Sequence, residues 1–191
     1  LPVGSRVCEA ARYSLLAGGK RVRAVLCMAA CELLGGRAQQ AAQLACAVEM
    51  LHCYSLIHDD LPCMDNDDFR RGKPSCHKAF GEATALLAGD LLLTEAFEAI
   101  AGAPVSEAAR VRATAALAHG AGSAGMVYGQ ELDLQYENQP TGEDVLRRVH
   151  RNKTGALINA AMQMGAAAAD GAEEDCRRLE QFAYDLGLVF Q

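Results

Sequence analysis

The sequence predicts an all-helical protein, on three observations. Hydrophobic residues make up 51% of the 191-residue chain, yet aromatic residues make up only 5% and tryptophan is absent. Alanine and leucine are abundant, and both form helices readily, whereas strands favour β-branched and aromatic residues. Apolar residues recur at helical spacing along most of the chain, and no segment has the pattern of a strand hairpin or a βαβ unit.

In the first half of the chain, helices are expected at residues 7–16, 21–34 and 40–58. Paired glycines at 18–19 and 35–36 are expected to end the first two, because glycine is favoured just after a helix. Pro62 is expected to close the third, since the residue before a proline is pushed out of α geometry. The polar stretch 65–78 contains glycine and proline and is expected to be a loop.

In the second half, helices are expected at residues 82–101, 106–136, 142–164 and 172–190. Glycines at positions 120, 122 and 125 are expected to break the second of these, because glycine has a low helix propensity. The alanine run at 166–169 is interpreted as a helix end. A chain of this length is expected to form one domain, residues 1–191.

Charge and hydropathy exclude two classes of partner. The formal net charge is −6, so no non-specific nucleic-acid surface is expected, and an anionic substrate would need local lysines, arginines or metal ions. Stable membrane insertion is not expected either. The most apolar stretch, residues 83–101, is interrupted by Asp90, Glu95 and Glu98, and a membrane-spanning helix needs about 20 apolar residues.

The eight cysteines lack the paired spacing of a zinc site or a disulfide framework. Cys63, Cys76 and His77 are close in sequence but have no apparent fourth ligand. Cys27 and Cys31 are one helical turn apart among apolar residues, so we expect them in the core. This cysteine content fits a reducing compartment, either the cytoplasm or a plastid stroma.

The most specific feature is an acidic cluster. Residues 59–68 contain five aspartates: Asp59, Asp60, Asp65, Asp67 and Asp68. These carboxylates repel one another unless cations neutralise them. Magnesium usually takes one or two protein carboxylates and completes its octahedron with water and phosphate oxygens. A solvated acidic loop is the alternative, whereas the spacing is not that of a calcium-binding EF-hand.

Basic residues close to this cluster favour a phosphate ligand. Arg70 and Arg71 follow it, and the sequence Gly-Gly-Lys-Arg-Val-Arg at 18–23 places three cations at the expected start of a helix, where backbone N–H groups favour phosphate. His52 lies seven residues before Asp59 and therefore on the same helix face, although a buried core histidine is the alternative.

Four motifs together resemble the short-chain trans-isoprenyl diphosphate synthases, the farnesyl and geranylgeranyl diphosphate synthases of bacteria and plastids. They are residues 18–23, residues 59–65 with the following arginine pair, Gly129-Gln130 and Lys153-Thr154. The resemblance implies a helical isoprenoid synthase bundle around a central apolar cavity. It also implies that the chain is truncated at both ends and lacks the C-terminal portion with the second aspartate-rich motif.

The resemblance also implies roles for individual residues. The residues that correspond to ligands of the isopentenyl diphosphate are Lys20, Arg23, His52 and Arg71. Those that correspond to contacts of the allylic substrate are Arg70, Lys153, Thr154, Gln191 and, lining the same cavity, Gln130. Asp59 and Asp65 correspond to Mg²⁺ ligands with Asp60 in support, and these three with Lys153 form the expected catalytic set.

The implied activity is a prenyltransferase that condenses isopentenyl diphosphate with dimethylallyl or geranyl diphosphate. Tyr54, five residues before Asp59, is expected to limit product length, because its ring would block a growing chain. Farnesyl diphosphate is therefore the expected product, with geranylgeranyl diphosphate as the alternative. A homodimer is expected. Some heteromeric members pair through a CxxxC motif, so a subunit contact is the alternative role of Cys27 and Cys31.

Two other functions are weighed. A non-catalytic partner subunit of a heteromeric synthase would usually lack the aspartate motif, which is present here. A terpene cyclase would not need the cations that correspond to isopentenyl diphosphate ligands.

Overall fold

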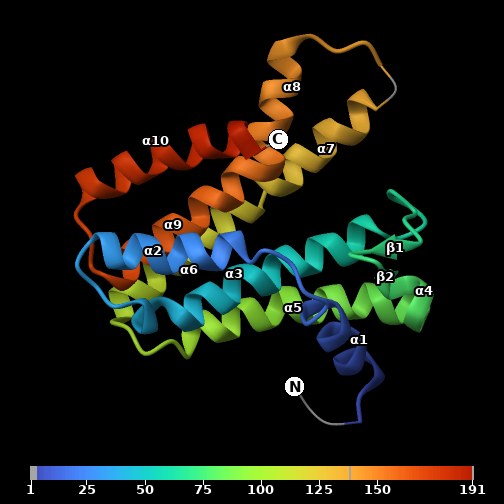
Figure 1. Ribbon diagram of the computed structural model, residues 1–191, viewed down its shortest axis with the longest axis horizontal. Helices are drawn as coiled ribbons and strands as arrows, with labels where there is room; N and C mark the ends of the chain where they lie inside the picture. Colours follow the sequence, from blue (N-terminus) through green and yellow to red (C-terminus); the bar gives the residue numbers. More distant parts are fainter. Residues whose placement is uncertain (1–3, 138, 191) are drawn as a thin grey trace. The chain divides into compact units, whose positions relative to one another are not determined.

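The computed structural model describes residues 4–137 and 139–190. The helices in this part of the chain are α1 (Arg6–Leu15), α2 (Val22–Leu33), α3 (Ala38–Asp59), α4 (Cys76–Phe80), α5 (Glu82–Ala101), α6 (Glu107–Ala121), α7 (Met126–Tyr136), α8 (Glu143–His150), α9 (Ala156–Ala168) and α10 (Glu173–Phe190) (Figure 1). None of them is both long enough and apolar enough to cross a membrane. The all-α prediction is confirmed.

Helix boundaries follow local signals in the sequence. Ser106 caps α6, because its hydroxyl accepts a hydrogen bond from the Ala109 N–H at 3.1 Å. The break between α6 and α7 falls at the predicted glycines. At Gly125 a Cβ atom would lie 2.1 Å from the carbonyl oxygen of Gly120, so only glycine fits this close approach.

The stretch 65–78 is not the pure loop that was expected, and the expectation of no hairpin was wrong. Strands β1 (Phe69–Arg70) and β2 (Lys73–Pro74) pair antiparallel. Arg71 and Gly72 form the turn, with φ values of 55° and 76°, and a type I′ turn requires a positive φ at both central positions. Two-residue strands are too short to leave an alternating pattern.

The helix expected at residues 142–164 is also different in the structure, where it is divided into two α-helices. A π-helical turn, η1 (Arg151–Gly155), joins α8 to α9, and α9 continues to Ala168. The turn is in contact with α7, α8, α9 and α10. A π turn contains the same residue types as the α-helix around it, so periodicity alone does not reveal it.

The chain divides into two compact units. Unit 1 comprises the residues up to Arg21 together with Glu49–Ala99, and unit 2 comprises Val22–Val48 and the residues from Ile100 onward. Helices α3 and α5 contribute residues to both. The single domain over residues 1–191 stays a prediction, as does the central cavity.

Unit 1 has an apolar core beneath the hairpin. Its buried members come from α1, α3, α4, α5 and the loop after α3: Ala10, Ala11, Cys53, Ile57, Leu61, Cys76, Ala85, Ala88 and Leu92. Tyr13 of α1 ties this core to the hairpin, because its hydroxyl donates to the Pro74 carbonyl at 2.8 Å and its ring meets Phe80 edge-on at 5.3 Å. Helix α1 therefore supports the hairpin that carries the arginine pair.

Unit 2 is built around α9, which packs against α2, α6 and α10 (Figure 1). Small residues allow the close approach. A Cβ atom at Gly165 would lie 2.0 Å from the Cys27 carbonyl oxygen, and one at Gly120 would lie 2.7 Å from the Ala160 Cβ. Cys27 and Cys31 are fully buried, as predicted, and burial raises the pKa of Cys27 to about 12.

Candidate active site

The aspartate-rich segment forms a closed loop at the end of α3. Asp59 is the last residue of that helix, and its carbonyl accepts a hydrogen bond from the Asp65 N–H at 2.9 Å. Leu61 accepts from the Met64 N–H at 2.9 Å inside the loop. The backbone bond brings the two predicted metal ligands to the neck of one loop, with Asp59 half-buried and Asp65 exposed.

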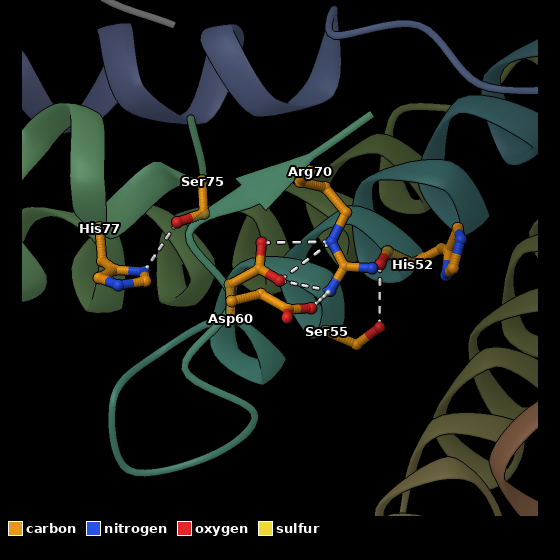
Figure 2. A network of polar contacts seen from close by, with 7 residues as sticks. His52, Ser55, Asp60, Arg70, Ser75 and His77 are labelled. Atoms are coloured by element: carbon orange, nitrogen blue, oxygen red, sulfur yellow. Dashed lines mark hydrogen bonds and ion pairs between the residues drawn. The ribbon is translucent and has the colours of Figure 1, made fainter. Parts of the chain in front are cut away.

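Asp60, by contrast, is directed into the protein and held by an arginine (Figure 2). Its side chain is 3% exposed, and it accepts hydrogen bonds from Arg70 Nε at 3.0 Å and from Arg70 Nη2. Arg70 also lies 3.3 Å from Asp67. The hydrogen bond to Asp60 raises the pKa of Arg70, although burial opposes this. Asp60 is thus the partner of a cation contributed by the hairpin.

The two arginines of the hairpin have different partners. Arg70 turns to Asp60, whereas Arg71, at the tight turn, donates a hydrogen bond from Nη1 to the Gly18 carbonyl. A Cβ atom at Gly19 would lie 2.6 Å from the Arg71 Cζ, and φ at Gly19 is 117°, a conformation that suits glycine alone. Two segments about 50 residues apart in sequence, the glycine loop and the hairpin, are therefore in direct contact.

Lys20, Arg21 and Arg23, the three cations that follow the paired glycines, have separate surroundings. Lys20 is exposed in the loop that Arg71 contacts. Arg21 has a structural role, because it donates to the Leu15 carbonyl and forms an ion pair with the buried Glu49 at 3.4 Å. Arg23 is half-buried in α2 and belongs to unit 2.

His52 and Tyr54 lie on α3 before the aspartates. His52 is half-buried, its carbonyl accepts from the Ser55 hydroxyl at 2.9 Å, and its ring points away from the Asp60–Arg70 pair (Figure 2). Tyr54 is also half-buried, and its ring meets that of His58 edge-on at 5.4 Å. Burial raises the pKa of Tyr54, and the charges of Asp59 and Asp90 raise it further.

Lys153 and Thr154 lie in the π turn of unit 2. The Lys153 ammonium is 2.6 Å from an Asp133 carboxylate oxygen, and Thr154 is buried. A Cβ atom at Gly129 would lie 2.1 Å from the Lys153 backbone nitrogen, so glycine allows α7 to approach the turn. Gln130 follows Gly129, and its Nε2 is buried without a hydrogen-bond partner among the described residues. Gln191 lies outside the described residues.

Asp133 was missed by the sequence analysis. It stands four residues after Gly129 on α7 and therefore on the same helix face as the Gly129-Gln130 motif. That spacing was the available signal in the sequence.

The carboxylates of the aspartate loop suit magnesium. Asp59 and Asp65 offer oxygen donors at one loop neck, and Mg²⁺ usually needs only one or two protein carboxylates. Asp60 is already paired with Arg70. No group of three or more His, Cys, Asp or Glu side chains within the described ranges is arranged to hold a metal ion by itself. Substrate oxygens would have to complete the coordination.

Comparison with known proteins shows the family of the chain. The family model described as polyprenyl synthetase matches residues 5–191. The chain belongs to the polyprenyl synthetase family. Two solved structures share its fold at 42% sequence identity, and in both comparisons all of this chain is matched. They are an FPP/GFPP synthase from Zymomonas mobilis (TM-score 0.95, with 72% of that chain matched) and a geranyltransferase from Legionella pneumophila (TM-score 0.93, with 69% of that chain matched). The predicted isoprenoid synthase fold is confirmed.

Curated relatives in plants are similar over nearly the whole chain. The chloroplastic heterodimeric geranylgeranyl pyrophosphate synthase large subunit 1 of Arabidopsis thaliana is 52% identical over 193 residues, which cover 97% of this chain and 52% of the relative. The chloroplastic geranylgeranyl pyrophosphate synthase of Capsicum annuum is 51% identical over 186 residues, 96% of this chain and 50% of the relative. The chain thus spans about half the length of the curated relatives it matches.

Proposed function

We propose that the protein is a magnesium-dependent trans-prenyltransferase that joins isopentenyl diphosphate to an allylic diphosphate. The observation that carries this proposal is the contact between Arg71 and the Gly18-Gly19 loop, next to Lys20. It gathers cations from two distant segments in the same unit as the Asp59–Asp65 loop. Membership of the polyprenyl synthetase family supports the same reaction.

Charge explains why these residues are needed. Each substrate carries a diphosphate, whereas the chain has a net charge of −6, so binding depends on local cations. We assign the isopentenyl diphosphate to Lys20, Arg23, His52 and Arg71. We assign the allylic diphosphate to Arg70, Lys153, Thr154, Gln130 and Gln191.

The reaction begins when the C–O bond of the allylic diphosphate breaks and the electron pair leaves with the diphosphate. Lys153 and Thr154 would stabilise the charge on the departing oxygens through a charge-assisted and a neutral hydrogen bond. Magnesium, held by Asp59 and Asp65, would supply further positive charge to those oxygens. The double bond of isopentenyl diphosphate then attacks the allylic carbon, and a proton lost to the released diphosphate restores a double bond.

Two products are candidates. The Tyr54 ring favours the fifteen-carbon farnesyl diphosphate, because a bulky aromatic beside the growing chain leaves no room for another five-carbon unit. The names of the plant relatives favour the twenty-carbon geranylgeranyl diphosphate. Analysis of the product decides between them.

The assembly and location are proposed on similar grounds. We propose a homodimer in a reducing compartment, and the chloroplastic relatives favour a plastid stroma. The relative named as the large subunit of a heterodimeric synthase makes a heteromer with a second subunit the alternative.

The experiment is product formation from labelled isopentenyl diphosphate with dimethylallyl, geranyl or farnesyl diphosphate, using the complete polypeptide with and without magnesium. Asp59→Ala should lower turnover by about a hundredfold or more while the melting temperature stays near that of the parent. Asp68→Asn, three residues beyond the Asp59–Asp65 loop and paired with Lys78, is the matched control and should stay active. Activity of Asp59→Ala within a few-fold of the control would refute the metal assignment.

A further inference from the structure

The ring of His58 is pressed against the backbone of α5 in unit 1. Its Nε2 lies 2.9 Å from the Leu86 carbonyl oxygen. Because a carbonyl only accepts hydrogen bonds, Nε2 must carry the proton and donate it. The same nitrogen is 3.9 Å from Asp90 Oδ1. Leu86 and Asp90, one helical turn apart on α5, therefore both lie close to the imidazole.

Gly89 makes this position of the ring possible. A Cβ atom there would lie 2.1 Å from His58 Nε2 and 2.4 Å from Cδ2, against the 3.4–4 Å of ordinary contact. Gly89 is buried inside a regular helix, where glycine costs about 1 kcal/mol relative to alanine. Its presence is explained by the space that the His58 ring needs.

The other side of the imidazole supports Tyr54. The two residues are one helical turn apart on α3, with ring centroids 5.4 Å apart and an interplanar angle of 88°, the favourable edge-to-face arrangement. His58 is thus held between α5 and the tyrosine ring. Any displacement of His58 from Gly89 must alter the packing of Tyr54.

We propose that His58 and Gly89 are positioning residues for product length, acting through Tyr54. This rests on the proposed function, in which the Tyr54 ring limits the growing chain. Neither residue needs to touch substrate: Gly89 leaves room for the imidazole, and the imidazole fixes the tyrosine. When the edge contact is lost, Tyr54 gains rotational freedom and the barrier to a longer chain weakens.

The test is the product distribution of the complete polypeptide with isopentenyl and dimethylallyl diphosphates. Gly89→Ala should raise the ratio of longer products to the parent's main product by about fivefold, a change of roughly 1 kcal/mol in relative barriers. His58→Ala should do the same by removing the support directly. Leu87→Ala is the matched control on α5, because its side chain is exposed, and it should leave the ratio unchanged.

Double variants identify the route of the effect. Adding Gly89→Ala to His58→Ala should change nothing further, because the clash is gone, and adding it to Tyr54→Ala should likewise have no effect. A purely structural role for Gly89 would lower the melting temperature and leave the product ratio equal to that of Leu87→Ala. That result, combined with longer products from Tyr54→Ala, would overturn this inference and leave the proposed function intact.

Two further outcomes are separable from that one. Unchanged product length in Tyr54→Ala would refute the chain-length role of the tyrosine and this inference with it. If the parent forms no prenyl product at all with magnesium, the proposed function itself is wrong.

Discussion

Replacing Asp60 with asparagine should destabilise the protein measurably although the two side chains have nearly the same shape. The carboxylate is 3% exposed and accepts hydrogen bonds from two nitrogens of Arg70, which is 33% exposed. Asparagine keeps one acceptor oxygen, but it presents an NH₂ group to the guanidinium and removes the charge. Arg70 would then be a partly buried cation with a weaker partner.

The size of the effect follows from the burial of the two partners. Removing one partner of a fully buried ion pair costs about 3–5 kcal/mol. Arg70 is one-third exposed and keeps its contact with Asp67, so solvent and the second carboxylate reduce the loss to about 1–2 kcal/mol. For a protein of this size, that corresponds to a melting temperature about 2–8 °C lower.

The assay is thermal unfolding of Asp60→Asn beside Asp67→Asn. Asp67 also contacts Arg70, at 3.3 Å, but its side chain is 52% exposed, so its loss should cost less than about 0.5 kcal/mol. Equal melting temperatures for Asp60→Asn and the parent, or an equal decrease in both variants, would show that the buried pair does not stabilise the fold.

Two further predictions concern close packing and pH. Gly165→Ala should destabilise by about 2 kcal/mol or more in urea unfolding, because its Cβ would lie 2.0 Å from the Cys27 carbonyl oxygen. Gly142→Ala, with nothing within 4 Å of the added Cβ, should cost less than about 1 kcal/mol, the effect of alanine at the N-cap of α8. A hydrogen bond from Lys78 lowers the pKa of Asp68 below its ordinary value of 3.8. The ion pair therefore stabilises the fold fully above pH 3.8, and this stabilisation is lost as the pH falls through the lowered pKa. In Lys78→Gln the pKa of Asp68, followed by NMR titration, should return towards 3.8, and an unchanged pKa would exclude Lys78 as the cause.

The sequence predicted the helices well because their ends have local signals. The glycines before α2, the serine cap of α6 and the glycines between α6 and α7 all act on their own neighbours. The hairpin was missed because its turn contains Arg71 and Gly72, not the Asn-Gly or Asp-Gly pair that usually marks a type I′ turn. Its strands contain only two residues each.

The candidate site was predicted in its residue types but not in its pairings. The aspartate loop and the basic residues were found from their spacing, and their roles in binding stay predictions. The Asp60–Arg70 pair depends on the hairpin folding back over ten residues, and the contact of Arg71 with Gly18 depends on tertiary structure. Such contacts leave no periodic signal in the sequence. The same holds for the ion pair between Lys153 and Asp133.

The π turn at Arg151–Gly155 should determine which positions of α8 and α9 tolerate substitution. A π turn amounts to one residue inserted into an α-helix, and each residue of an α-helix advances the side-chain direction by about 100°. Positions in α8 and α9 therefore belong to two different helical phases, with the change at Lys153. In a scan of single substitutions from 143 to 168, the tolerant positions should follow a 3.6-residue period on each side, offset by one residue at the turn. Deleting one residue within the turn would restore a single phase and turn α8 away from its present neighbours.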